Sequence, residues 1–126
     1  MEGTRPSILL VDDDVAIRDA LAEVLVDEGY AVHEAPNGKE ALDWLRHEGS
    51  NGSRPCVVLL DLMMPVMDGR AFLAVRNADP ALSTIPILVI SAETGCADLA
   101  RAEGVSGVFP KPLALDGLLE AIGRYL

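Results

Sequence analysis

The sequence contains 126 residues, half of them hydrophobic, which is enough for one domain with its own apolar core. Acidic residues outnumber basic ones by 20 to 10, and the formal net charge is −10. An acidic surface disfavours direct binding to nucleic acid, which needs basic side chains to replace counterions. The apolar runs are too short for a membrane span or a secretory signal. The 2 cysteines give no disulfide framework or zinc-binding spacing, so we expect a cytoplasmic protein.

The first predicted strand, Ser7–Val11, is an apolar run that leads directly into the acidic triplet Asp12–Asp14. Short continuous apolar runs are typical of strands buried on both faces of a parallel sheet. Asp14 can cap a first helix that extends to about Glu28, and Gly29 ends it. The residues of this helix that we expect to face the core are Ile17, Ala20, Leu21, Val24 and Leu25.

A short second strand, Tyr30–Glu34, and a second helix near Lys39–His47 follow, and Asn37-Gly38 forms the turn before that helix. The polar stretch Glu48–Pro55 is predicted to be a surface loop because it consists largely of turn-forming residues. The helix residues that we expect to face inward are Ala41, Leu42 and Leu45.

The third strand, Val57–Leu60, runs directly into Asp61. The segment Leu62–Gly69 then forms the connection to a third helix near Arg70–Asn77. This helix has three apolar residues to bury, which are Phe72, Leu73 and Val75.

Two further strands, Ile87–Ile90 and Gly107–Phe109, lead to Ser91 and Lys111 respectively. Between them the sequence predicts a short fourth helix near Cys96–Glu103, which is poor in large apolar residues. A last helix carries apolar residues at helical spacing, namely Leu115, Leu118, Leu119, Ile122 and Leu126.

The alternation of strands and helices predicts a single α/β domain over residues 1–126, with an ordered core from about residue 6. Five β-α units in succession resemble the flavodoxin-like fold, a (βα)5 three-layer sandwich around a parallel five-stranded sheet of order 2-1-3-4-5. We therefore expect this architecture, with no second domain and no internal repeat.

Polar residues follow four of the predicted strands at the point where each strand ends. They are Asp12 and Asp13, Asp61, Ser91 and Lys111. In an open parallel sheet, ligands bind outside the carboxyl ends of the strands, so these side chains should meet at one edge. Clustered carboxylates repel one another unless a hard cation neutralises them, and Mg²⁺ prefers oxygen ligands. An aspartate beside Mg²⁺ and a lysine can act as a nucleophile toward phosphorus.

Four strings carry a resemblance to a known family, and they occur in the order LLVDDD, LLDLMMPVMDG, VISAE and FPKPL. Together they resemble the receiver domain of bacterial two-component response regulators, whose best-known single-domain example is the chemotaxis receiver. The resemblance covers the chain from about Pro6 to Leu126. It implies a signalling domain that catalyses its own phosphorylation and dephosphorylation, with a sensor histidine kinase or histidine phosphotransfer protein as donor. It also implies an output protein or domain whose binding the phosphorylation would switch.

The resemblance also implies a role for each residue at the sheet edge. Asp13 and Asp61 would bind Mg²⁺ directly, Asp12 would act through water, and the backbone carbonyl of Met63 would supply a further ligand. Asp14 leaves the register of the acidic triplet open, and we assign it the helix cap because Val11 closes the apolar strand.

The remaining roles concern the phosphoryl group itself. Asp61 would be the phosphoacceptor, Lys111 would contact the phosphoryl oxygens, and the hydroxyl of Ser91 would bind the same group. The chain departs from the family pattern at Val108, where many receivers carry an aromatic residue that relays phosphorylation. We therefore expect the segment Glu93–Gly104, loosened by Gly95, to carry the conformational change.

Two alternative functions would use similar residues. A haloacid-dehalogenase-like phosphatase also uses an aspartyl nucleophile and Mg²⁺, but it usually has a second aspartate two residues later, where this chain has Met63. A phosphorylation-independent pseudo-receiver would serve only as an interaction module. The presence of Asp13, Asp61, Ser91 and Lys111 disfavours it.

Overall fold

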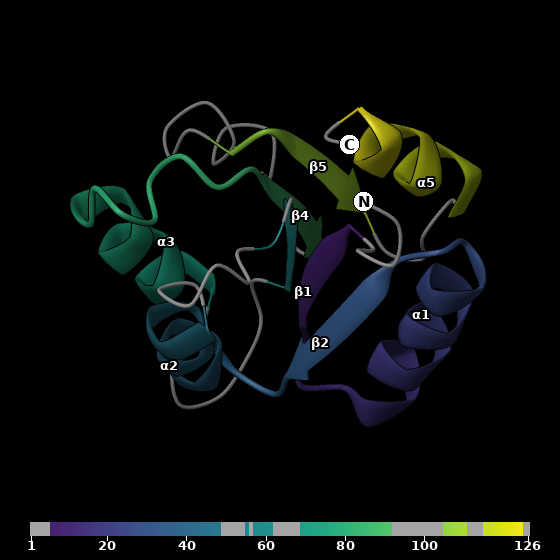
Figure 1. Cartoon of the computed structure of the whole chain (residues 1–126), viewed down its shortest axis with the longest axis horizontal. Coiled ribbons are helices and arrows are strands. Elements are labelled where there is room, and N and C mark those ends of the chain that lie inside the picture. Colours follow the sequence, from purple (N-terminus) through teal and green to yellow (C-terminus); the bar gives the residue numbers. More distant parts are fainter. Residues whose placement is uncertain are drawn as a thin grey trace.

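The computed structural model describes residues 6–48, 55, 57–61, 69–91, 105–110 and 115–124. Within these residues, five strands form one parallel sheet of order β2-β1-β3-β4-β5, which confirms the predicted order (Figure 1). The strands are β1 (Ser7–Val11), β2 (Ala31–Ala35), β3 (Val57–Asp61), β4 (Ile87–Ser91) and β5 (Gly107–Pro110). The described helices are α1 (Val15–Asp27), α2 (Gly38–Glu48), α3 (Gly69–Ala78) and α5 (Leu115–Gly123).

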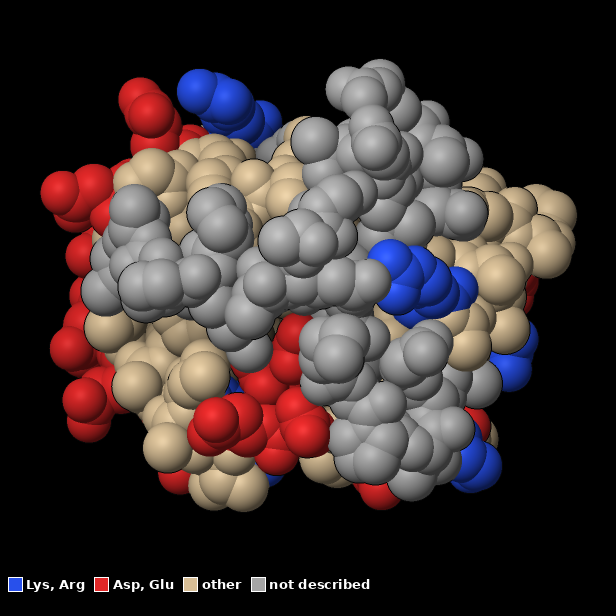
Figure 2. Space-filling model, turned by 180° about the vertical axis from the view of Figure 1, so that it is seen from behind, with Lys and Arg blue, Asp and Glu red and all other residues tan. Residues whose placement is uncertain are grey.

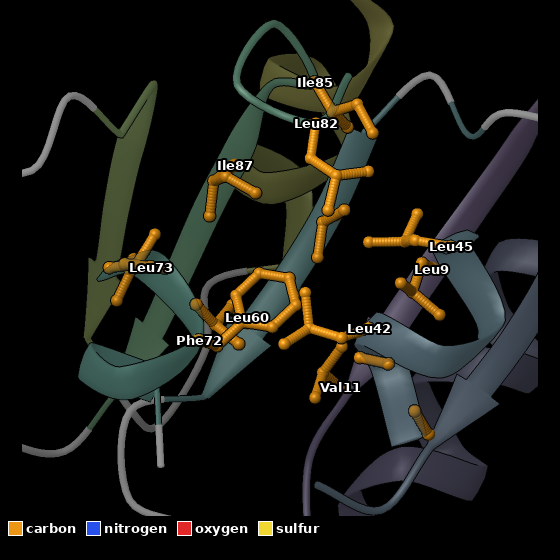
Figure 3. Close-up of a cluster of buried hydrophobic side chains, with 14 residues drawn as sticks. Leu9, Val11, Leu42, Leu45, Leu60, Phe72, Leu73, Leu82, Ile85 and Ile87 are labelled. Carbon is orange, nitrogen blue, oxygen red and sulfur yellow. The ribbon is translucent and has the colours of Figure 1, made fainter. Parts of the chain in front are cut away.

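Side chains of the central strands alternate between two separate apolar layers, because successive residues of a strand point to opposite faces of the sheet. One layer contains Leu9, Val11, Val58 and Leu60 and packs against α2 and α3, as Figure 3 shows for its labelled residues. The other layer packs against α1 and α5, and its strand members are Ile8, Leu10, Val57, Leu59, Leu88 and Ile90. The sheet is therefore the middle layer of a three-layer sandwich, as the sequence predicted.

Helix α1 has well-defined ends. Asp14 is its N-cap, and its Oδ1 accepts a hydrogen bond of 3.2 Å from the backbone N–H of Ile17. At the other end, Gly29 has a φ of 98°, a conformation that favours glycine. The N–H groups of Gly29 and Tyr30 donate to the carbonyls of Val26 and Leu25, which is the Schellman arrangement. Both the cap and the terminating glycine are as predicted.

Two details of this region differ from the prediction. Ala20 is exposed, whereas Ala22 lies in the core beside Leu21 and Leu25. The second strand begins at Ala31 and not at Tyr30, because the N–H of Tyr30 still bonds to the end of α1. The aromatic side chain of Tyr30 is nevertheless buried, at 7% exposure.

Helix α2 packs on one face of the sheet, against β1 and β2. Oδ1 of Asn37 accepts a hydrogen bond of 2.9 Å from the backbone N–H of Glu40, so Asn37 caps the helix. The side chains of Ala41, Leu42 and Leu45 are buried, as expected. On the same helix the Trp44 ring stacks on the His33 ring of β2, with centroids 4.5 Å apart and an interplanar angle of 14°.

Helix α3 buries the predicted Phe72 and Leu73, and Val75 packs partly against the same layer. It also buries a charge that the apolar pattern did not predict. The Arg76 side chain donates from one guanidinium nitrogen to the carbonyl of Ile85 and from another to Oδ1 of Asn77, both at 2.7 Å. Burial lowers the pKa of the Arg76 guanidinium from its ordinary value. Arg76 thus links α3 to Ile85, which lies just before β4.

In α5, Leu118 and Ile122 are buried and Leu119 is half-buried, as predicted. The predicted fourth helix near Cys96–Glu103 and the connections at 49–54 and 62–68 lie outside the described residues. Among the helices that the structure describes, none combines the length and apolar character needed to cross a bilayer.

Candidate functional site

The carboxyl ends of β1 and β3 bring two of the predicted acids together. Val11 pairs with Leu60 in the parallel register, so the next residues, Asp12 and Asp61, lie level with each other. Asp61 also pairs with Ile90 of β4. The N–H of Asp12 donates to the carbonyl of Ala35 at 3.2 Å, which holds it to the end of β2 as well.

The three acids at this edge lie within metal-binding distance of one another. Asp12, Asp13 and Asp61 each have one carboxylate oxygen within 4.8 Å of a carboxylate oxygen of the other two. Asp12 is 0% exposed and Asp61 is 3% exposed, whereas Asp13 is exposed. Buried carboxylates at this spacing repel strongly in a medium of low dielectric constant. A donor set made only of carboxylate oxygens suits a hard divalent cation.

The three consecutive aspartates have different local roles. Oδ1 of Asp12 accepts a hydrogen bond of 2.9 Å from the backbone N–H of Asp14, so one of its oxygens faces the chain. Asp14 caps α1 and is not part of the group of three. Asp13 lies between them with an exposed carboxylate. Asp12 and Asp13 are therefore the residues of the triplet whose carboxylates lie together with that of Asp61.

The other predicted site residues are described only in part. Ser91 is the last residue of β4, and its backbone pairs with Pro110 of β5. Lys111 and Met63 lie outside the described residues.

Sequence reasoning missed one residue of this region, Arg18. Its Nη1 donates to the backbone carbonyl of Asp12 at 2.7 Å, and its Nε donates to Oε1 of Glu34 at 3.0 Å. The signal in the sequence was slight: Arg18 is the one basic residue within α1 and follows Asp14 by one helical turn. Nothing in its spacing indicates that it reaches back to β1 and across to β2.

The charge distribution extends beyond the site. Figure 2 shows acidic side chains along one side of the face in view and in a further group low in its middle. The excess of acidic residues is therefore not confined to one place on the molecule, in line with the net charge of −10.

Comparison with known proteins identifies the family. The response regulator receiver domain matches residues 8–123. This chain is a member of that family. Such a domain is a signalling module of two-component systems, and its members generally bind Mg²⁺ at an acidic pocket, where this receiver carries Asp12, Asp13 and Asp61.

Individual relatives agree with this assignment. The receiver is 38% identical over 114 residues to the response regulator MprA of Mycolicibacterium vanbaalenii, covering 89% of this chain and 46% of the relative. It thus spans about half the length of that relative. Among solved structures, the chemotaxis response regulator CheY4 of Vibrio cholerae is 32% identical, with a TM-score of 0.81 and coverage of 98% and 100% of the two chains. The phosphorylated cyanobacterial phytochrome response regulator RcpA is 31% identical, with a TM-score of 0.79 and coverage of 96% and 91%.

Proposed function

We propose that this receiver accepts a phosphoryl group on Asp61 in a Mg²⁺-dependent reaction and thereby changes its affinity for a protein partner. The observation that carries the proposal is the position of Asp61. Its carboxylate ends a buried strand and is almost fully buried, yet it lies beside two further carboxylates. Such an arrangement of charges is costly unless a cation neutralises part of it. The phosphorylated state of RcpA, a relative over most of the chain, supports the same proposal.

In the proposed reaction, a carboxylate oxygen of Asp61 attacks the phosphorus atom of the donor. The P–O bond to Asp61 forms while the bond from phosphorus to the leaving group breaks, and the leaving group takes the electron pair. With a phosphohistidine donor, the bond that breaks is the P–N bond, and the leaving group is the imidazole of the donor's histidine. Phosphoryl transfer requires mainly positioning and neutralisation of charge from the protein. Attack by water on the acyl phosphate would later release inorganic phosphate and restore the carboxylate.

The residues present fit a bound Mg²⁺, which Asp13 and Asp61 would hold directly and Asp12 through water, with the carbonyl of Met63 as a further ligand. When bound, Mg²⁺ supplies positive charge against the carboxylates and against the phosphoryl oxygens. The chain's own contribution is to keep Asp61 and Asp12 level through the β1–β3 register and to hold Asp12 by its bonds to Ala35 and Asp14.

Ser91 and Lys111 are proposed to act on the phosphoryl group and not on the metal. Ser91 follows Ile90, the residue that pairs with Asp61, so its backbone lies one position beyond the phosphoacceptor on the neighbouring strand. The Lys111 ammonium would offset the negative charge of the phosphoryl oxygens. Phosphorylation would favour whichever state of the domain makes these contacts better.

The donor is proposed to be a sensor histidine kinase or a histidine phosphotransfer protein, and the output a separate protein or domain. The output mechanism should differ from an aromatic switch on β5. Val108 has two heavy atoms on its Cβ, which makes it stiff at χ1, and it packs partly against the layer under α3. A side chain of this size and stiffness has no ring to exchange between a buried and an exposed position.

The test is phosphorylation by a small phosphodonor, measured by mass spectrometry of the intact chain. With Mg²⁺, the wild type should gain one phosphoryl group, and both EDTA and Asp61→Asn should abolish the gain. Asp19→Asn, an exposed acid on α1, is the matched control and should be labelled like the wild type. No labelling of the wild type, together with no Mg²⁺-dependent binding of beryllofluoride, would show a pseudo-receiver. Full labelling of Asp61→Asn would place the acceptor elsewhere.

A further inference from the structure

We propose that Arg18 is a positioning residue that aims the metal-binding acids by fixing the peptide between Asp12 and Asp13. The inference rests on the proposed Mg²⁺ site and adds a residue to it. Arg18 lies on α1, yet its Nη1 donates at 2.7 Å to the backbone carbonyl of Asp12, at the end of β1. A hydrogen bond from a charged donor is shorter and stronger than one between neutral groups.

The contacts of Asp12 show what this bond controls. Its N–H is held by the carbonyl of Ala35 at 3.2 Å, and its Oδ1 by the N–H of Asp14 at 2.9 Å. The Arg18 bond adds the carbonyl, so the plane of the following peptide is fixed as well. That plane determines where the chain places Asp13. Because Asp13 is exposed and has little packing to orient it, its direction depends on the backbone.

Glu34 in turn holds Arg18 in place. The Nε of Arg18 donates to Oε1 of Glu34 at 3.0 Å, and the Arg18 side chain is only 16% exposed. One guanidinium therefore joins α1, the end of β1 and strand β2. The planar fork of arginine can make both bonds at once, whereas the lysine ammonium is a point charge without this geometry. Groups that orient metal ligands typically change metal affinity by about 10–100-fold when they are removed.

Charge and positioning predict opposite results, which makes the proposal testable. Arg18 is a cation close to a proposed cation site, so its charge alone would repel Mg²⁺. If charge were its main effect, Arg18→Met would bind Mg²⁺ more tightly than the wild type. If it positions the acids, the same variant should bind Mg²⁺ more weakly.

The experiment measures Mg²⁺ affinity in the whole chain by NMR titration of amide shifts, with Mn²⁺ binding by electron paramagnetic resonance as a second readout. We expect Arg18→Met to weaken both by about tenfold. Arg18→Lys, which keeps a charged donor, should recover part of the loss. Lys39→Met removes an equal charge from an exposed Lys39–Asp43 pair and should leave affinity within about twofold of the wild type. Unchanged or tighter binding in a folded Arg18→Met variant would overturn the proposal.

A second pair of variants tests Glu34 without altering Arg18. Glu34→Gln and Glu34→Leu remove the same charge, but glutamine keeps an oxygen that can accept the Nε–H bond. Glu34→Leu should therefore bind Mg²⁺ more weakly than Glu34→Gln, and equal affinities would contradict the positioning role.

The same titrations distinguish failure of the proposed Mg²⁺ site from failure of the role of Arg18. A wild type whose Mg²⁺ binding is absent or survives Asp61→Asn refutes the proposed site itself, and the Arg18 proposal with it. Binding that needs Asp61 but ignores both Arg18 and Glu34 refutes the positioning alone.

Discussion

Replacing Asp61 with asparagine should stabilise the metal-free domain. In the wild type, carboxylate oxygens of Asp61, Asp12 and Asp13 lie within 4.8 Å of one another. Two unit charges at that separation repel by about 3.5 kcal/mol at an effective dielectric constant of about 20, and by about 0.9 kcal/mol in bulk water. The larger figure applies to Asp61 with Asp12, since both are buried, and the smaller to the exposed Asp13. The cost of burying the new asparagine amide offsets part of the gain, which leaves about 1–3 kcal/mol.

The assay is urea unfolding followed by circular dichroism, first in EDTA and then with Mg²⁺ at ten times its dissociation constant. The wild type should gain about 1.4 kcal/mol from Mg²⁺ at that concentration, and Asp61→Asn should gain almost nothing. Asp19→Asn, an exposed acid on α1, should change the metal-free stability by less than about 0.5 kcal/mol. The reasoning is refuted if Asp61→Asn destabilises the metal-free domain, or if Mg²⁺ stabilises this variant as much as the wild type.

Three further predictions concern single residues. Arg76→Ala should lower the unfolding free energy by about 3 kcal/mol, and Arg76→Met should lower it by about half as much. Both variants leave the acceptor carbonyl unpaired, but only alanine also leaves a cavity. Equal urea midpoints for the two variants would contradict this. Gly29→Ala should lower the unfolding free energy by about 1–2 kcal/mol because Gly29 has a φ of 98°. Gly117→Ala, on the exposed surface of a helix, should instead raise it by up to about 1 kcal/mol. Thermal unfolding in which both variants shift the midpoint in the same direction would contradict this reasoning. Asp14→Ala should lower the unfolding free energy by about 1 kcal/mol because the helix cap is lost, but its Mg²⁺ affinity should stay within about threefold of the wild type. Asp13→Ala should lower the Mg²⁺ affinity at least about tenfold in the same titration. The reverse order of affinities would show that the acidic triplet was assigned in the wrong register.

The sheet could be predicted because its information is local. Continuous apolar runs such as Val57–Leu60 are typical of buried parallel strands, and a polar residue directly after such a run must lie at the sheet edge. This local pattern is sufficient to place Asp12 and Asp61 together at that edge. The caps Asp14 and Gly29 were equally local, because each depends on a single residue's side chain or backbone preference.

The errors came where tertiary contacts decide the outcome. Ala20 and Ala22 are alike in size and hydrophobicity, so only the packing of α1 on the sheet determines which one is buried. The roles of Arg18 and Arg76 depend on backbone carbonyls that lie outside their own helices, at Asp12 and Ile85. A basic residue has no periodic signature of its own, so its partners could not be predicted from spacing.

The stack of Trp44 on His33 gives this chain a built-in optical reporter with a defined location. Trp44 is the single tryptophan of the sequence, so its fluorescence describes one place, the contact between α2 and the edge strand β2. Edge elements can open locally with less free energy than the central strands. Fluorescence and circular dichroism therefore follow different parts of the same molecule. Coincidence of their unfolding curves would establish that the edge and the centre of the sheet unfold in one cooperative step.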